Sequence, residues 1–186
     1  MKLLRAADHR RMPWKNGGGE TLEVAVFPPD AGIAGFDWRV SMAVVAEDGR
    51  FSAFPGIDRT LVLLDGGGMT LDIAGRGPVL LTPDSAPCVF PGDVGTTATL
   101  TGGPIADLNV MTARGRYAHS VERFFDIRDV SVGARETVLL LGTGMIVTTT
   151  AGNNILGPRD LALLEGGEAA RVRPSTGLVM TIRPIG

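Results

Sequence analysis

The chain has 186 residues, enough for one large domain or two small packed ones. Its 18 basic and 20 acidic residues nearly cancel, and a pI near 5.7 without a basic block argues against nucleic acid as a partner. Cys88 is the only cysteine, which excludes an intrachain disulfide and a zinc site built on cysteines.

The first twelve residues carry charges throughout and lack the apolar run of a signal peptide. No window of the sequence approaches the roughly 20 apolar residues that a membrane span requires. We therefore expect a soluble protein from a reducing compartment, most simply the cytoplasm, with no membrane partner.

Residues 12–21 combine an aromatic ring, a cation, an amide and three consecutive glycines. Glycines let backbone N–H groups approach a ligand, and the lysine and asparagine add donors that suit a carboxylate. The ring of Trp14 offers a flat surface for a planar group. Alternatively, Trp14 is a core anchor and the glycines are only a turn. The candidate ligand contacts here are Trp14, Lys15, Asn16 and Gly17.

Residues 36–44 alternate apolar and polar side chains, as a strand does. Asp37, Arg39 and Ser41 share the polar face. In a half-exposed sheet this face meets water, whereas in a barrel it can point into the lumen. We take Arg39 and Ser41 as candidate ligand contacts.

Residues 51–59 form an aromatic-rich turn that leads into a buried strand. Arg59, at the mouth of that strand, could hold a carboxylate by two parallel hydrogen bonds, and Phe54 could form a wall. The alternative for Arg59 is a surface salt bridge with Asp58 or Asp65, worth less than about 1 kcal/mol.

Residues 107–111 also alternate, which places Asp107 and Asn109 side by side as a hydrogen-bonding edge. The alternative is an edge strand whose polar groups are solvated. We include both residues among the candidate ligand contacts.

The chain as a whole is predicted to be all-β. Its 26 glycines and 12 prolines leave segments of about five to eight residues, the length of strands. Helical periodicity is weak, and only Ala118–Asp126 is a candidate for a short helical turn. Segments rich in Val, Thr and Ile predict strands at Thr60–Leu64, Met69–Ile73, Val79–Thr82, Thr96–Thr101, Thr137–Leu141, Met145–Thr150 and Leu178–Ile182.

An internal echo suggests a duplicated unit. Residues 62–69 and residues 138–145 are identical at six of eight positions, and Gly92-Asp93 has a counterpart in Gly167-Glu168. Apolar strands bounded by glycine can resemble each other by chance. The favoured interpretation is two copies of one β unit, each a small cupin-like β-barrel.

We expect the boundary between the two units near residue 119. Residues 1–119 would then form an N-terminal cupin-like unit that carries the site, and residues 120–186 a C-terminal half packed on it. Within the second half, residues 152–160 are predicted only to form a turn.

The sequence offers no metal site, catalytic nucleophile or cofactor motif. His9 and His119 lie far apart and outside the His-x-His pattern of metal-binding cupins. Phosphate-loop, dinucleotide-binding and nucleophile-elbow motifs are missing as well. Cys88 lies in an apolar segment that would raise its thiol pKa, so we interpret it as a core residue.

The same segments resemble the HutD/Ves family, in order over roughly residues 3–115. The matching motifs are residues 12–21, 38–43, 49–59, 63–66 and 107–112. The resemblance implies a metal-free cupin, often a bicupin. It also implies a role beside the histidine-degradation genes, in which the protein governs that pathway by binding an intermediate, urocanate or formylglutamate.

Either metabolite fits the candidate residues. Positive charge for a carboxylate would come from Lys15, Arg39 and Arg59, stacking from Trp14 or Phe54, and acceptors for an imidazole or formamide N–H from Asp107 and Asn109. Hydrogen bonds to charged groups contribute about 1.5–3 kcal/mol each, so two or three make micromolar affinity, roughly −8 kcal/mol, plausible.

We expect a regulator that binds this small carboxylate. A first alternative is a metal-independent enzyme that isomerises or hydrolyses a small acid, with Asp107 as base and Arg59 at a developing oxyanion. A second is an interaction module with a packed lumen, in which Arg39 pairs with Asp37 or Asp107. Because cupin strands often pair across a two-fold axis, a homodimer is also expected.

Overall fold

The computed structural model describes residues 1–14, 17–174 and 176–186. Over these residues the secondary structure is β apart from one 3-10 turn at Ala6–Asp8. The chain divides into two compact units, which we call the central unit (Arg10–Arg116) and the terminal unit (Met1–His9 with Tyr117–Gly186). The expected boundary near residue 119 stays a prediction.

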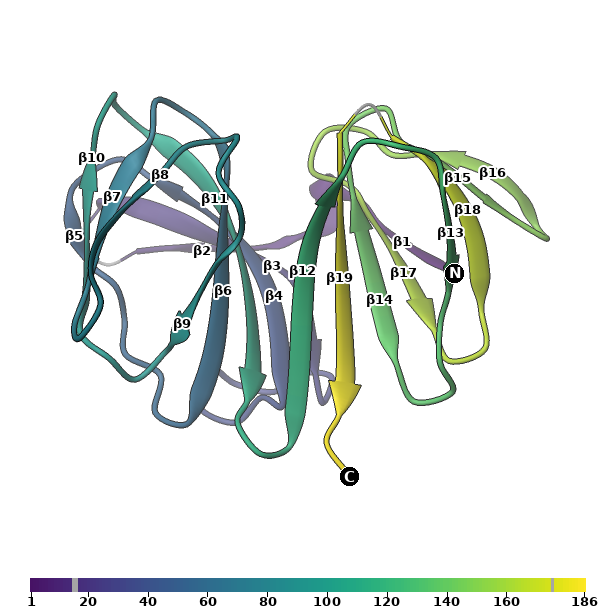
Figure 1. Cartoon of the computed structure of the whole chain (residues 1–186), viewed down its shortest axis with the longest axis horizontal. Coiled ribbons are helices and arrows are strands. Elements are labelled where there is room, and N and C mark those ends of the chain that lie inside the picture. The colour runs from purple at the N-terminus through teal and green to yellow at the C-terminus, as the bar shows by residue number, and fades with distance from the viewer. Residues whose placement is uncertain (15–16, 175) are drawn as a thin grey trace. The chain divides into compact units, whose positions relative to one another are not determined.

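The central unit consists of two antiparallel sheets (Figure 1). An apolar cluster takes its side chains from both sheets. One sheet has the strand order β2-β3-β4-β11-β6-β9 and the other β5-β10-β7-β8. The cluster takes Leu61 and Leu63 from the first sheet and Leu71 and Ile73 from the second. The strands are β2 (Arg10–Pro13), β3 (Gly19–Phe27), β4 (Trp38–Val45), β5 (Gly49–Arg50), β6 (Ile57–Asp65), β7 (Met69–Ile73), β8 (Gly77–Leu81), β9 (Cys88–Pro91), β10 (Thr96–Leu100) and β11 (Ile105–Ala113).

The terminal unit also has two antiparallel sheets, ordered β1-β17-β14-β19-β12 and β13-β18-β15-β16. The N-terminal strand belongs to it because β1 pairs with β17. The strands are β1 (Lys2–Leu4), β12 (Tyr117–Phe124), β13 (Arg128–Ser131), β14 (Thr137–Leu141), β15 (Ile146–Thr149), β16 (Gly152–Ile155), β17 (Leu161–Glu165), β18 (Ala169–Arg173) and β19 (Gly177–Pro184).

The two units repeat one topology. The order β4-β11-β6-β9 in the central unit corresponds to β12-β19-β14-β17 in the terminal unit, and β5-β10-β7-β8 corresponds to β13-β18-β15-β16. The two halves of the sequence echo lie in the corresponding strands β6 and β14 and in the turns that follow them. This confirms the duplicated β unit.

A β-bulge changes which residues of the echo face inward. Residue 107 of β11 pairs with Leu63, but residue 106 pairs with Asp65, so Leu64 is an extra residue on β6. The inward residues of β6 are therefore Leu61 and Leu63, whereas those of β14 are Val138 and Leu140. Identical sequence positions thus lie on opposite faces in the two units.

The seven predicted strands are all confirmed. The helical turn predicted at Ala118–Asp126 is wrong, because residues 117–124 pair along their whole length with β19, which satisfies the backbone groups of this segment. The turn predicted at residues 152–160 is also wrong in part, since Gly152–Ile155 pairs with β15 as the edge strand β16.

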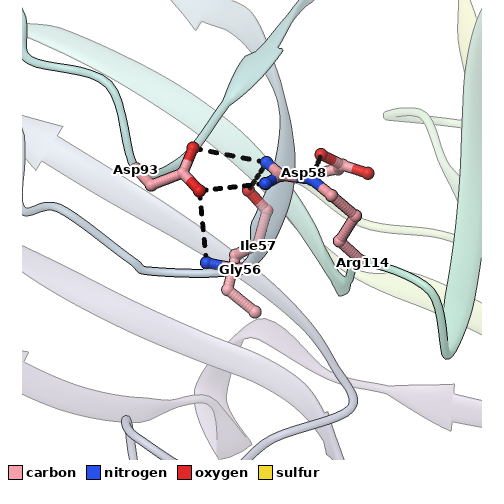
Figure 2. Close-up of polar contacts among 5 residues, drawn as sticks. All are labelled: Gly56, Ile57, Asp58, Asp93 and Arg114. Atoms are coloured by element: carbon pink, nitrogen blue, oxygen red, sulfur yellow. Dashed lines mark hydrogen bonds and ion pairs between the residues drawn. The ribbon is translucent and has the colours of Figure 1, made fainter.

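A network around Arg114, at the end of β11, anchors the start of β6 (Figure 2). The Arg114 side chain donates hydrogen bonds to Asp58 (2.8 Å) and Asp93 (2.9 Å), and Asp93 also accepts from the backbone N–H of Gly56 (3.3 Å). The hydrogen bond from Arg114 holds the pKa of Asp93 below its ordinary value. The network fixes the chain immediately before Arg59.

Gly19, the last of the three consecutive glycines, lies where no side chain fits. A Cβ at this position would be 2.3 Å from the carbonyl oxygen of Val44 and 3.0 Å from the Trp14 ring. Its own carbonyl accepts the Trp14 backbone N–H at 2.9 Å. The glycine is therefore needed for the close packing of Trp14 and β3 against β4.

We expect Gly19→Ala to lower the free energy of unfolding by about 1–3 kcal/mol, because the added methyl group must displace backbone. Urea unfolding would measure the change. Gly35→Ala is the matched control, since a Cβ there meets nothing within 4 Å. Equal stability of the two variants would contradict this account of Gly19.

Candidate functional site

A cavity of about 460 Å³ opens inside the central unit. Seven of the ten predicted ligand contacts line it. These are Trp14, Arg39, Ser41, Phe54, Arg59, Asp107 and Asn109. Gly17 is not among the lining residues, and the predictions for Lys15 and Asn16 fall outside the described residues. The geometry below describes these side chains; ligand binding by them stays a prediction.

The polar side chains come from three neighbouring strands, β4, β11 and β6. Met111 of β11 is paired with both Arg59 and Arg39, so the two arginines lie in one row across the sheet. Asn109 is paired with Ser41 in the next row. Alternate residues of a strand point the same way, and these side chains all line the cavity.

Arg39 and Ser41, on the polar face of residues 36–44, therefore point into the lumen instead of toward water. Arg39 is 3% exposed and Ser41 is 2% exposed. In the neighbouring strand Asp107 is fully buried and Asn109 is 4% exposed, so the solvated edge considered for them is also excluded.

Arg59 is buried, with 6% of its surface exposed, and forms no surface salt bridge with Asp58 or Asp65. Its Nε donates to Asn109 Oδ1 at 2.7 Å, and Nη2 donates to the same oxygen. The guanidinium lies over the ring of Phe51 at 4.5 Å. Burial lowers the pKa of Arg59 to about 10, although the nearby Asp107 carboxyl acts to raise it. It therefore remains a cation at neutral pH.

Asp107 and Arg59 are linked through the amide of Asn109. Asn109 Nδ2 donates to Asp107 Oδ1 at 2.6 Å, while its carbonyl oxygen accepts from Arg59. Asp107 Oδ2 is buried and has no hydrogen-bond partner among the described residues. Burial raises the pKa of Asp107 to about 6, although Arg59, Asn109 and a hydrogen bond from the Ala43 backbone all act to lower it.

Arg39 forms an ion pair with Glu23 of β3, a residue that the sequence analysis missed and that also pairs with the exposed Arg10. Arg39 Nε donates to Glu23 Oε2 at 2.7 Å, and Nη1 donates to Ser41 Oγ at 3.3 Å. Asp37 is instead paired with Arg116. The pairing of Arg39 with Asp37 or Asp107, expected for a packed interaction module, is therefore not formed. The signal that could have revealed Glu23 is that Thr21 and Glu23 flank the apolar Leu22, as polar residues on one face of a strand do.

Three aromatic side chains, Trp14, Phe51 and Phe54, line the cavity. Trp14 is half-buried, donates from Nε1 to Thr21 Oγ1 at 2.9 Å and packs against the apolar cluster. Trp14 is thus a core anchor that also lines the cavity, and its stacking against a ligand stays a prediction. Phe54 and Phe51 are also half-buried lining residues. Phe51, which was not singled out from the sequence, covers the Arg59 guanidinium.

The mouth of the cavity carries exposed charges of both signs. Glu47, Asp48 and Arg50 line it, all in the segment between β4 and β6. Among residues 1–14, 17–174 and 176–186, His, Cys, Asp and Glu side chains form no group of three that could hold a metal ion. Cys88 is buried in the apolar cluster, and burial raises its thiol pKa, as the sequence predicted.

Comparison with known proteins settles the family. The HutD family profile matches residues 6–180. This chain belongs to the HutD family. It is 36% identical over 170 residues to an uncharacterized 21.2 kDa protein in the hutC 3' region of Pseudomonas putida, covering 90% of this chain and 88% of that protein. It is 39% identical over 141 residues to protein Ves of Citrobacter koseri, covering 74% and 72% respectively.

Solved structures agree with this assignment. HutD from Pseudomonas fluorescens SBW25 superposes with a TM-score of 0.86 at 29% identity, covering 100% of this chain and 99% of that one. A cupin 2 conserved barrel domain protein from Leptotrichia buccalis gives a TM-score of 0.58 at 7% identity, covering 89% and 88%, and shows the fold alone. The cupin-like, bicupin fold is thus confirmed. No helix in the described part of the chain has the length and apolar character of a membrane span.

The raised pKa of Asp107 predicts a pH-dependent stability. Its folded-state pKa of about 6 exceeds the ordinary aspartate value of 3.8, so the folded state binds more protons than the unfolded state between about pH 4 and pH 6. The free energy of unfolding, relative to Asp107→Asn, should therefore fall by about 3 kcal/mol as the pH rises through that window.

Urea unfolding of both proteins from pH 4 to pH 7.5 measures this difference. Asp84→Asn, which changes an exposed carboxylate outside the cavity, serves as the control. A difference between wild type and Asp107→Asn that does not vary with pH would show that the buried carboxyl has an ordinary pKa.

Proposed function

We propose that this HutD-family protein binds a small carboxylate metabolite, urocanate or formylglutamate, and thereby regulates histidine catabolism. The binding site is the lumen cavity of the central unit. The carboxylate is held by Arg59, the planar part of the ligand lies against Trp14 or Phe54, and the other polar groups meet Ser41, Asn109 and Asp107.

The observation that carries the proposal is the state of Arg59. Its guanidinium is buried in a cavity, and no carboxylate of the described residues lies within ion-pair distance of it. Its two hydrogen bonds go to one neutral amide oxygen. Burial of a cation without an ion-pair partner is costly, and a ligand carboxylate offsets that cost.

The regulatory part of the proposal is supported by the relatives. The chain belongs to the HutD family, and one relative is named for its place beside hutC. A cavity of about 460 Å³ has the size of a small-molecule site. A protein of this kind would report the level of a pathway intermediate by being occupied or empty.

We expect Arg59→Met to weaken binding of urocanate or formylglutamate by about 10- to 100-fold, since it removes one or more charge-assisted hydrogen bonds. Isothermal titration calorimetry measures the dissociation constants. Arg11→Met is the control, because Arg11 is exposed and pairs with Glu20 on the surface. Undiminished binding by Arg59→Met would remove Arg59 from the site.

Folding must be checked separately, because Met at position 59 leaves Asn109 Oδ1 without its donor. Arg59→Lys keeps the positive charge but loses the two-point geometry, so it should fold and still bind the carboxylate more weakly than wild type. If both variants unfold, Arg59 is part of a structural network and the assignment is wrong.

A second candidate function rests on Asp107. Asp107 belongs to the cavity lining, and a pKa raised to about 6 suits a general base near neutral pH. Arg59 would then stabilise a developing oxyanion on a small acid. Incubation of the protein with each candidate ligand, followed by NMR, decides the matter: turnover that Asp107→Asn abolishes favours the enzyme.

A further inference from the structure

One exposed apolar side chain belongs to the lining of the cavity in the central unit. Ile33 lies in the connection between β3 and β4, and 61% of its surface is exposed. Single exposed apolar residues are common on protein surfaces, so the exposure alone needs no explanation. The position of Ile33 is the informative feature. Leu80 and Val89 of the same unit are equally exposed, yet neither is among the lining residues.

The chain on either side of Ile33 is held against the cavity. Ala31 and the buried Phe36 pack in a small apolar cluster that also contains Phe54 and Met111. The ring centroids of Phe36 and Phe54 lie 6.2 Å apart. Phe54 and Met111 line the cavity themselves. The packing of its neighbours therefore keeps Ile33 at the mouth of the cavity.

The tip of this connection has room around it. A Cβ added at Gly32 or Gly35 would meet nothing within 4 Å. Backbone hydrogen bonds close two turns within the connection, from the Ala31 N–H to the Pro28 carbonyl at 3.1 Å and from the Gly35 N–H to the Gly32 carbonyl at 3.0 Å. The Ile33 side chain therefore stands on a defined turn with open space beside it, which a ligand in the cavity can fill.

Arg59 and Ile33 lie at different depths of the same cavity. Arg59 is 6% exposed and Ile33 is 61% exposed, and both belong to the lining. A ligand whose carboxylate reaches Arg59 therefore extends outward toward the mouth. The charged lining residues there, Glu47, Asp48 and Arg50, are exposed and water solvates them. Removal of the Ile33 side chain from water, in contrast, is favourable.

We propose that Ile33 is a ligand-binding residue that covers the outer, apolar part of an acid whose carboxylate is held by Arg59. This rests on the proposed function, since Arg59 fixes which end of the ligand enters the cavity first. It deepens that function by naming the class of ligand, an acid whose carboxylate is joined to an apolar or ring-bearing body. Burial of that body against Ile33 adds hydrophobic free energy to the charge-assisted hydrogen bonds at Arg59.

Methyl NMR tests the contact directly. The isoleucine δ1 methyl groups of the full chain are labelled, and Ile33→Val identifies the Ile33 signal by its disappearance. With urocanate at millimolar concentration, we expect nuclear Overhauser effects between the urocanate ring protons and the Ile33 methyl group. Ile73 is the internal control, because it is buried in the apolar cluster and does not line the cavity, so its methyl group should show none.

Isothermal titration calorimetry tests the energetic consequence of that contact. Ile33→Ser replaces the apolar surface with a hydroxyl group, so urocanate and 3-(2-furyl)acrylate should each bind about 5- to 10-fold more weakly than to wild type. Leu80→Ser removes an equally exposed side chain outside the cavity and should leave both affinities unchanged. Both substitutions change exposed side chains, so both variants should fold.

Failure of this inference and failure of the proposed function are distinguishable. If urocanate binds wild type but shows no contact with the Ile33 methyl group, the role assigned to Ile33 is overturned while carboxylate binding stands. The same conclusion follows if Ile33→Ser binds both acids as tightly as Leu80→Ser does. If neither acid binds wild type at millimolar concentration, the proposed function falls and this inference with it. Because the NMR contact is measured on wild type, it does not depend on the folding of a variant.

Discussion

The burial of the Arg59 guanidinium is the constraint on which the central unit depends. A cation in a barrel interior must have its N–H groups satisfied, and here Asn109 takes two of them while aromatic rings cover the faces. Asn109 can do so only because Asp107 accepts from its amide nitrogen. Three residues on two strands thus form one polar chain that lines the cavity.

The terminal unit shows what the same topology looks like without this constraint. Its two sheets follow the strand order of the central unit, yet the space between them is filled by an apolar cluster that includes Val138, Leu140, Leu164 and Val172. In the central unit the bulge at Leu64 places Leu61 and Leu63 inward instead, in line with Arg59. The extra residue at this bulge therefore reverses which face of the repeated segment points inward in the central unit.

Much of this could be predicted from the sequence, because alternation is a local property of a strand. The alternation around Arg39 and Asn109 correctly placed their side chains on one face. Whether that face meets water or the lumen of a barrel depends on how the sheet closes, which involves residues far apart in the sequence. The sequence alone therefore left both alternatives possible. The pairing of Arg39 with Glu23 was missed for the same reason, since it joins neighbouring strands separated by a long connection. The strand at 117–124 was mistaken for a helical turn because only its pairing with β19 reveals it.

The comparison between the two units also bears on why the polar interior exists. Replacing buried charges with well-packed apolar residues is often neutral or stabilising, and the terminal unit shows that this topology accommodates such a core. Stability alone therefore gives no reason to keep Arg59, Asn109 and Asp107 inside the central unit. Under the proposed function, a ligand carboxylate would supply the ion-pair partner that the buried Arg59 guanidinium lacks among the described residues. The cost of its burial in the empty protein then becomes part of the free energy that favours the bound state.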